Sequence, residues 1–281
     1  LSRRQRQMCI RDRWCYIVAV LLILIYLLPI YIMLNLSFRT IQDVGSKLSL
    51  PAMWNFQNYI DVFKSGDLWM GFKNSIVLVV ETVVLEIVFS ALAAYGLARS
   101  NGKIAESIRN VNMGIMMIPG VALLVGTYGL MVKFHMTNTL YGLALLSAAG
   151  GIPGTMFMYV NFVVSIPVAL DEAAAIDGAG IWQRIIHIMI PAIKKLAGTL
   201  LILQIISVFQ IMYEPMVLTK GGPDNASLSL MQLMWQYAFG GSMNYGKATA
   251  VAVIVTLILL VMTAIYSYFC LLYTSPSPRD S

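Results

Sequence analysis

Residues 171–191 of this chain read DEAAAIDGAGIWQRIIHIMIP, a stretch in which charged residues alternate with apolar residues at helix-like spacing. The chain on its N-terminal side, residues 136–170, contains no charged residue at all. This contrast predicts a pair of short amphipathic helices that lies at one face of a membrane, between two membrane-spanning helices. The stretch therefore indicates a membrane protein with a helical segment at its surface.

Further long apolar stretches, without charge except for Glu81, Glu86 and Glu214, extend this prediction to six membrane-spanning helices. A helix needs about 20 apolar residues to cross a bilayer, and residues 14–38 supply 25 without a charge. Gly150-Gly151-Ile152-Pro153 predicts a broken or re-entrant entry to the fourth span. The predicted fold class is all-α, a polytopic membrane protein. The expected spans are residues 14–38, 74–98, 111–132, 140–168, 196–219 and 248–269.

The composition excludes several classes of protein. The 281 residues are 59% hydrophobic and only 11% charged, with a mean hydropathy of +0.77, whereas soluble domains carry about 25% charged residues. This excludes an ordinary cytosolic enzyme, a disordered chain and a nucleic-acid-binding protein. The chain has no phosphate-binding glycine loop followed by Lys-Ser/Thr, so any ATP would be hydrolysed by another chain. No residues at metal-ligand spacing suggest a metal site, and we expect no cofactor.

The two ends of the chain are expected not to be native protein. Residues 8–12 back-translate to ATG TGT ATA AGA GAC, and the reverse complement of that string reads through residues 271–274 in a shifted frame. We interpret residues 1–13 and 270–281 as translated sequencing-library adapter and residues 14–269 as the transmembrane domain. Without these ends 13 basic and 11 acidic residues remain, so the net charge falls from +6 to +2. The basic pI therefore indicates no anionic partner.

The opening segment also carries the strongest motif. Glu172-Ala173-Ala174 is followed three positions on by Asp177-Gly178-Ala179, and Ile188-Met189-Ile190-Pro191 comes after it. This arrangement resembles the EAA loop of the inner-membrane permease subunits of binding-protein-dependent ABC importers, with Ile190 in place of the usual Leu. We call residues 171–191 the coupling segment. Further stretches agree with the same family pattern: residues 72–75, 92–99, 138–139, 166–167, 221–223 and 245–248.

The resemblance implies both a fold and a set of partners. It implies the type I importer permease fold, in a multi-pass chain of a bacterial or archaeal cytoplasmic (inner) membrane. The similarity is to the carbohydrate-uptake branch, of the maltose or glycerol-phosphate type. In such importers two different permeases pair, an ATP-binding cassette ATPase dimer lies beneath them, and an extracytoplasmic solute-binding protein docks outside. The residues that the resemblance assigns to coupling with the ATPase are Glu172, Ala173, Ala174, Asp177, Gly178 and Ala179.

The chemistry of the coupling segment fits this role, although the residues alone also fit an interfacial helix at the lipid surface. The small residues would let a short helix approach a partner closely. Gly178 can adopt positive φ and turn the chain between two helices. We expect Glu172 near a helix start, Asp177 as the cap of the second helix, and Pro191 in the first turn of the next span.

A few polar residues inside the spans could line a path for the solute. Gln210, Tyr213 and Glu214 have helical i, i+3, i+4 spacing and are expected to share a face. Tyr159 and Asn161 in the fourth span are further candidates. Polar packing between helices explains Gln210, Tyr213 and Glu214 as well as a solute path does, and it is the favoured explanation for Tyr159 and Asn161. Glu81 and Glu86 lie in the second span, where carboxylates are costly. We favour a hydrogen bond to the partner permease or a headgroup-level position over a place in the solute path.

The sequence thus predicts a non-enzymatic permease subunit that moves a carbohydrate. A permease for another polar solute, such as a glycerol phosphate or an oligopeptide, is the first alternative. A self-sufficient secondary transporter would show inverted repeats, and no internal repeat is visible. A structural membrane scaffold would not require the Asp-Gly-Ala turn. The loop charges do not decide the orientation, because the two sides carry six and seven Lys and Arg residues outside the terminal segments.

Overall fold

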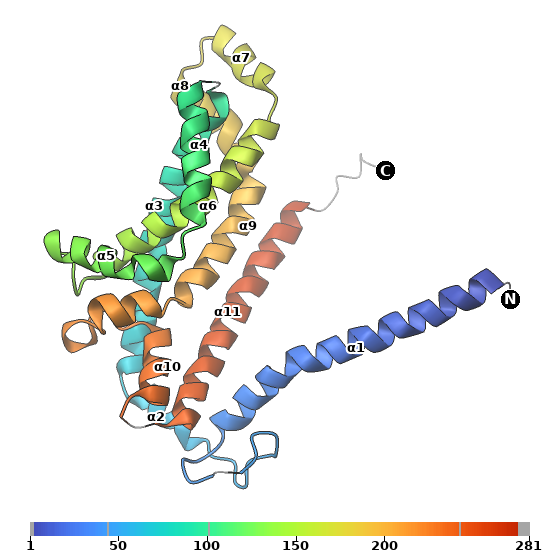
Figure 1. The fold of residues 1–281 in the computed structure, drawn as a ribbon, viewed down its shortest axis with the longest axis vertical. Coiled ribbons are helices and arrows are strands. Elements are labelled where there is room, and N and C mark those ends of the chain that lie inside the picture. Colours follow the sequence, from blue (N-terminus) through green and yellow to red (C-terminus); the bar gives the residue numbers. More distant parts are fainter. Residues whose placement is uncertain (1–2, 44, 101, 242, 275–281) are drawn as a thin grey trace. The chain divides into compact units, whose positions relative to one another are not determined.

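The computed structural model describes residues 3–43, 45–100, 102–241 and 243–274, and every regular element in these ranges is a helix (Figure 1). The all-α prediction is confirmed for this part of the chain. The terminal segments that we expect to be non-native, residues 1–13 and 270–281, lie partly outside the described residues. The chain divides into two compact units, residues 1–66 with 234–257 and residues 67–233 with 258–281.

The number of apolar helices agrees with the predicted six spans. Four helices are long and apolar enough to cross a membrane, and the number rises to six if each of two bent helix pairs is one span. The four are α1 (Arg3–Ser37), α3 (Asp67–Arg99), α6 (Leu140–Ser165) and α11 (Tyr245–Thr274). The bent pairs are Lys103–Met116 with Gly120–Lys133 and Ile181–Lys194 with Ala197–Phe209.

The third and fifth spans, expected at residues 111–132 and 196–219, are irregular in the structure. In the third, α4 (Lys103–Met116) and α5 (Gly120–Lys133) meet at 103°. Pro119 is the N-cap of α5 and has extended backbone. Because proline has no N–H and disfavours helix in the residue before it, Ile118, α4 ends before this point. In the fifth, α9 (Ile190–Phe209) ends ten residues early. A π-helical turn, η2 (Pro215–Thr219), follows it and begins at a proline.

The predicted break at residues 150–153 is wrong, because α6 continues through it without interruption. Pro153 has no N–H, so α6 lacks the hydrogen bond to the carbonyl of Ala149, and a helix at membrane depth tolerates this loss where it packs against neighbouring helices. Two side chains of the adjacent helices bind α6 at this level. Ser90 Oγ donates to the Ile152 carbonyl at 3.4 Å, and Asn112 Nδ2 donates to the Pro153 carbonyl at 2.9 Å. The predicted end of this helix near Pro167 is confirmed.

In the first unit, the loop after α1 is organised by a buried arginine. Arg39 is 3% exposed and donates to the carbonyls of Gly45, Ser46 and Ser49. The helix α2 (Gln57–Lys64) follows, and Asp61 on it forms an ion pair with Lys247 at 2.8 Å. Hydrogen bonds from Lys247 and then Gln57 lower the pKa of Asp61 below its ordinary value. The first residues of α11 therefore contact α2.

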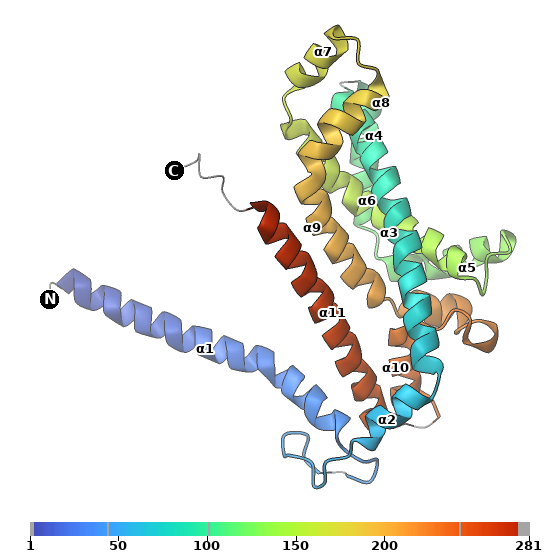
Figure 2. The same ribbon diagram turned by 180° about the vertical axis from the view of Figure 1, so that it is seen from behind.

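The second unit is a helical bundle built on α3 and α6, which pack along each other with α4 and α9 beside them (Figures 1 and 2). One buried cluster joins α3, α4 and α6 through Ala94, Leu97, Ala105, Met156, Tyr159 and Val160. The short helices α7 (Val168–Ile176) and α8 (Ile181–Arg184) follow α6, and a π-helical turn, η1 (Ile185–Met189), leads into α9. The chain then continues through η3 (Pro223–Asn225) to α10 (Leu230–Phe239).

Candidate functional site

The coupling segment forms the predicted pair of short helices, and Gly178 makes the turn between them. The N–H of Ala179 donates to the Ala174 carbonyl at 2.9 Å, and the N–H of Gly178 donates to the Ala175 carbonyl at 3.1 Å. These two bonds are the pair that closes a Schellman motif, in which the residue after the helix cap adopts positive φ. Gly178 has φ +84°, as the sequence predicts. The Asp-Gly-Ala sequence thus ends α7 and turns the chain towards α8.

The first helix of the segment presents small and charged side chains to solvent. Glu172, Ala173 and Gly178 are exposed, and Ile176 is 86% exposed, which is unusual for a large apolar side chain outside the spans. A hollow of about 340 Å³ lies beside the turn. It is lined by Ala174, Asp177, Gly178, Ala179, Gln183, His187 and Ile188. Four of the six residues assigned to coupling therefore gather at this hollow, whereas Glu172 and Ala173 do not line it.

Two details of the segment differ from the sequence analysis. Glu172, expected near a helix start, is the fifth residue of α7, because the helix begins at Val168 and Asp171 is its first-turn acidic residue. Asp177 does not cap α8, since it is the C-terminal cap of α7 and the cap position of α8 is Gly180. The Gly180 N–H instead donates to the side-chain oxygen of Gln183 at 2.7 Å. The physical reason is the Gly178 turn, because three residues, Gly178 to Gly180, separate Asp177 from the first residue of α8.

An ion pair that the sequence analysis missed holds α7 to the bundle. Arg99 Nε lies 2.6 Å from Asp171 Oδ2, with 15% and 7% of the two side chains exposed. Arg99 Nη1 also donates to the carbonyls of Val163 and Ile166, both at 3.2 Å, at the C-terminal end of α6. A cation is favourable at a helix C-terminus. The last residue of α3 thus connects the end of α6 to the first turn of α7.

The other end of the coupling segment is held by apolar packing. Ile185 and Met189 of η1 form a buried cluster with Val163 of α6 and Ile193 of α9, and Ile166 completes it. Pro191 lies in the first turn of α9, where its missing N–H costs little, and this prediction is confirmed. The exposed helix α7 is therefore connected to the bundle at both ends. Arg99 connects its first turn to α3 and α6, and the packing of η1 connects the chain after it to α6 and α9.

A buried carboxylate joins the same three helices deeper in the bundle. Glu86 of α3 is 1% exposed and accepts hydrogen bonds from Thr155 of α6, at 2.5 Å, and from Gln204 of α9. We call these three residues the Glu86 cluster. A Cβ atom on Gly151 would lie 2.6 Å from the Glu86 carboxyl carbon, so glycine makes room for the carboxylate. The hydrogen bonds of Glu86 are within the chain, and the expected bond to a partner permease is not needed to explain its burial.

The structure separates the residues suggested for a solute path. Gln210, Tyr213 and Glu214 do not share a helical face, because α9 ends at Phe209 and the backbone at residues 210–212 is not helical. Tyr159 is fully buried, whereas Asn161 is exposed. No single surface in the described residues brings these five side chains together, and a role for any of them in solute movement stays a prediction.

Known proteins are similar to most of this chain. Residues 86–270 match the family model described as binding-protein-dependent transport system inner membrane component. The melibiose/raffinose/stachyose import permease protein MelC of Bacillus subtilis is 32% identical over 185 residues, which are 66% of this chain and 67% of that protein. The diacetylchitobiose uptake system permease protein NgcG of Streptomyces coelicolor is 29% identical over 237 residues, 83% of this chain and 77% of that protein.

Solved structures show the same fold. A chain from the crystal structure of a bacterial ABC transporter involved in the import of the acidic polysaccharide alginate has a TM-score of 0.79 at 19% identity, covering 96% of this chain and 98% of that chain. A chain of the MetNI methionine ABC transporter has a TM-score of 0.58 at 20% identity, covering 74% and 96%. The matched family region contains the whole coupling segment and begins at Glu86. The chain belongs to the family of inner membrane components of binding-protein-dependent transport systems.

Proposed function

We propose that this multi-pass membrane protein is the permease subunit of an ATP-driven importer that brings a carbohydrate into the cell. The observation that carries the proposal is an exposed α7 that is tied to three helices of the bundle through Arg99 and Ile185. The two relatives described above take up oligosaccharides, and they support the carbohydrate class. The fold alone does not select a solute, because chains of alginate and methionine transporters share it.

The arrangement suggests how the coupling segment acts. The ATPase dimer would receive α7, whose alanines permit close approach and whose exposed Ile176 offers apolar surface. A displacement of α7 would reach α3 and α6 through the Arg99–Asp171 pair, and α9 through the packing of Met189 and Ile193. Because these helices share buried contacts, they would move together and open the solute path to one side or the other. A second permease and an extracytoplasmic binding protein complete the proposed assembly.

Co-purification tests this proposal. A tagged native version is purified from its own host membrane, and the bound chains are identified by mass spectrometry. We expect an ATP-binding subunit and a different permease, and we expect the ATPase rate of the complex to rise with an oligosaccharide-loaded binding protein. A homo-oligomer without an ATPase, obtained in detergent that preserves a known importer, would contradict the importer proposal. Stimulation by a non-carbohydrate solute alone would contradict only the carbohydrate class.

A further inference from the structure

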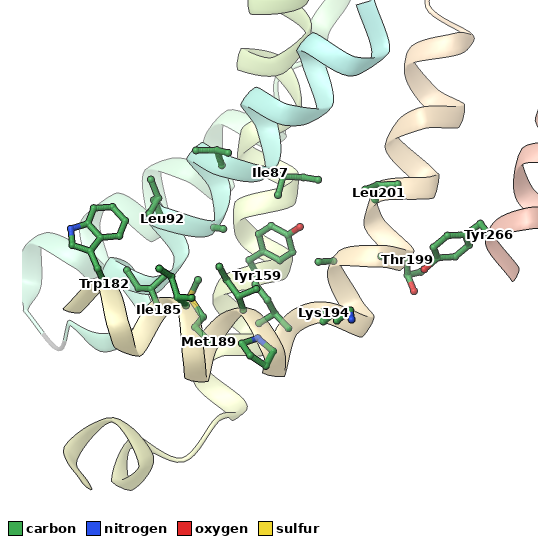
Figure 3. Close-up of a pocket in the computed structure, with 18 residues that line it drawn as sticks. Ile87, Leu92, Tyr159, Trp182, Ile185, Met189, Lys194, Thr199, Leu201 and Tyr266 are labelled. Atoms are coloured by element: carbon green, nitrogen blue, oxygen red, sulfur yellow. The ribbon is translucent and has the colours of Figure 1, made fainter. Parts of the chain in front are cut away.

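Two apolar surfaces of the chain face space that no described residue fills. In the second unit, a cavity of about 990 Å³ is lined by side chains such as Ile87, Leu92 and Leu201 (Figure 3), and no group in its lining identifies an occupant. In the first unit, exposed apolar side chains border the end of α1, whose apolar stretch is 0% buried by the rest of the chain. Because a bilayer surrounds a helix of this length and composition, the second surface has a definable partner.

The chain folds back against α1 at residues 45–50, which we call the 45–50 loop. The Tyr31 hydroxyl donates to the Leu48 carbonyl at 2.8 Å, and Asn35 Nδ2 donates to the Ser49 carbonyl at 2.5 Å. Tyr31 lies six positions before the end of α1, which is about 9 Å along the helix axis. The 45–50 loop therefore lies beside the last turns of the spanning helix and not beyond its end.

Side chains donate hydrogen bonds to the backbone carbonyls of this loop one after another. Tyr31, Asn35 and Arg39 together donate to every carbonyl from Gly45 to Ser49. Carbonyls exposed to water find donors in the solvent, whereas a carbonyl without a donor in apolar surroundings costs free energy. The satisfied carbonyls therefore permit irregular backbone to approach the apolar edge of a bilayer.

Aromatic side chains lie at the same end of α1. The ring centroid of Phe38, the residue after α1, lies 5.3 Å from that of Trp54 and 5.2 Å from that of Phe56. Trp54 and Phe56 are 57% and 60% exposed, and Leu48 and Leu50 in the 45–50 loop are 58% and 64% exposed. Tryptophan is enriched where a membrane meets water, because its ring is apolar and its N–H is polar. These side chains are suited to the boundary between headgroups and acyl chains.

We propose that the 45–50 loop and the aromatic side chains around Phe38 form a membrane-contact surface that is covered by phospholipid. Leu48 and Leu50 contact the first carbons of the acyl chains in the leaflet at the C-terminal end of α1. Lys47 extends its amine towards the phosphates, as long basic side chains do near the ends of spans. The proposal requires only that α1 crosses the membrane, and it is independent of the solute that the importer carries.

Spin labels attached to cysteine test the depth of the loop. Leu48 and Leu50 are labelled singly in the assembled importer in lipid nanodiscs, after the three cysteines of the chain are changed to serine. The references are Ile23, which is 56% exposed within α1, and Lys64, which is exposed on α2.

The quantity measured is the ratio of label collisions with oxygen to collisions with chromium oxalate. We expect this ratio at residues 48 and 50 to exceed that at residue 64 roughly fivefold or more, because a charged chelate is excluded from acyl chains. It should approach the ratio at residue 23. A ratio equal to that at residue 64 would place the loop in water and overturn the proposal.

Removing donors tests whether the satisfied carbonyls set this depth. Tyr31→Phe deletes the bond to the Leu48 carbonyl, and Arg39→Gln deletes the bonds to three carbonyls. We expect the ratio at residue 50 to fall towards the value at residue 64, by more in Arg39→Gln. Tyr31→Phe provides the result if Arg39→Gln does not fold, and Tyr26→Phe on the exposed surface of α1 is the control that should change nothing.

Two outcomes of these variants and of cross-linking would count against the proposal. A ratio at residue 50 that neither Tyr31→Phe nor Arg39→Gln changes would contradict the role of the carbonyl donors. A photo-reactive group at residue 48 that cross-links to a second permease or to a binding protein, and not to lipid, would show a protein occupant and overturn the lipid contact.

Discussion

Gly178→Val is expected to uncouple ATP hydrolysis from transport. Gly178 has φ +84°, and a Cβ atom built there meets no atom within 4 Å, so the penalty is in the backbone and not in a clash. A left-handed conformation costs an L-residue about 1–2 kcal/mol, and β-branching adds to this. The strain would open the turn and break the bonds that Ala179 and Gly178 donate to α7. A shift of this size reduces the population of the competent turn roughly 5–30-fold.

The measurement is the ATPase rate of the assembled complex with and without solute-loaded binding protein. Stimulation should fall roughly fivefold or more in Gly178→Val. Gly178→Asn is the matched control, since asparagine tolerates positive φ, and it should retain most of the stimulation. Glu86→Gln should have a smaller effect than Gly178→Val, because an amide oxygen can still accept from Thr155. Unchanged stimulation in Gly178→Val would contradict the role of the turn, and a solute-specific loss in Glu86→Gln would place Glu86 in the solute path.

Arg99→Ala is expected to have the second large effect, on stability and transport together. The change leaves Asp171 with 7% of its side chain exposed and no cation beside it. Breaking a buried ion pair by removing one partner costs about 3–5 kcal/mol. It also removes the donors to the carbonyls of Val163 and Ile166 at the end of α6. We therefore expect a lower midpoint of thermal unfolding for the assembled complex and reduced solute uptake.

A double-mutant cycle separates the pair from general damage. Arg99→Ala, Asp171→Ala and the double variant are compared, with Arg109→Ala on α4 as a control that leaves the ion pair intact. The double variant should be no less stable than Arg99→Ala, because it has no buried charge without a partner. Additive losses in the cycle, or a loss in Arg109→Ala as large as that in Arg99→Ala, would show that the pair has no special role.

The sequence predicts the features that depend on local pattern. Long apolar stretches predict helices α1, α3, α6 and α11, because a helix needs about 20 mostly apolar residues to cross a bilayer. The Asp177-Gly178-Ala179 sequence predicts the turn, since glycine tolerates the positive φ observed there. The bend at Pro119 and the end of α9 at Phe209 were not predicted, because proline can kink a helix or end it and only packing decides which, and because the apolar pattern of the fifth span continues past Phe209.

Contacts between distant residues were beyond reach of the sequence. Arg99 and Asp171 are 72 positions apart, and nothing in a single sequence pairs one basic loop residue with one acidic residue. Glu86 has partners on two other helices, so its burial within this chain could not be told from a bond to a second permease. The position of Arg99 at the end of a long apolar helix did indicate that it lies at a membrane face, but not which residue it pairs with. Gly150 to Pro153 likewise predicted a break, because a single sequence does not show that α6 packs against α3 and α4.

Site-specific photo-cross-linking tests the central claim most directly. A photo-reactive amino acid replaces Ile176, the 86% exposed residue of α7, in the assembled importer. The control position is Ile41, which is 64% exposed in the loop after α1. The account predicts that residue 176 cross-links to the ATPase subunit, with a yield that changes when ATP is added, and that residue 41 does not. Cross-links from residue 176 to lipid alone, or equal labelling of the ATPase from both positions, would contradict it.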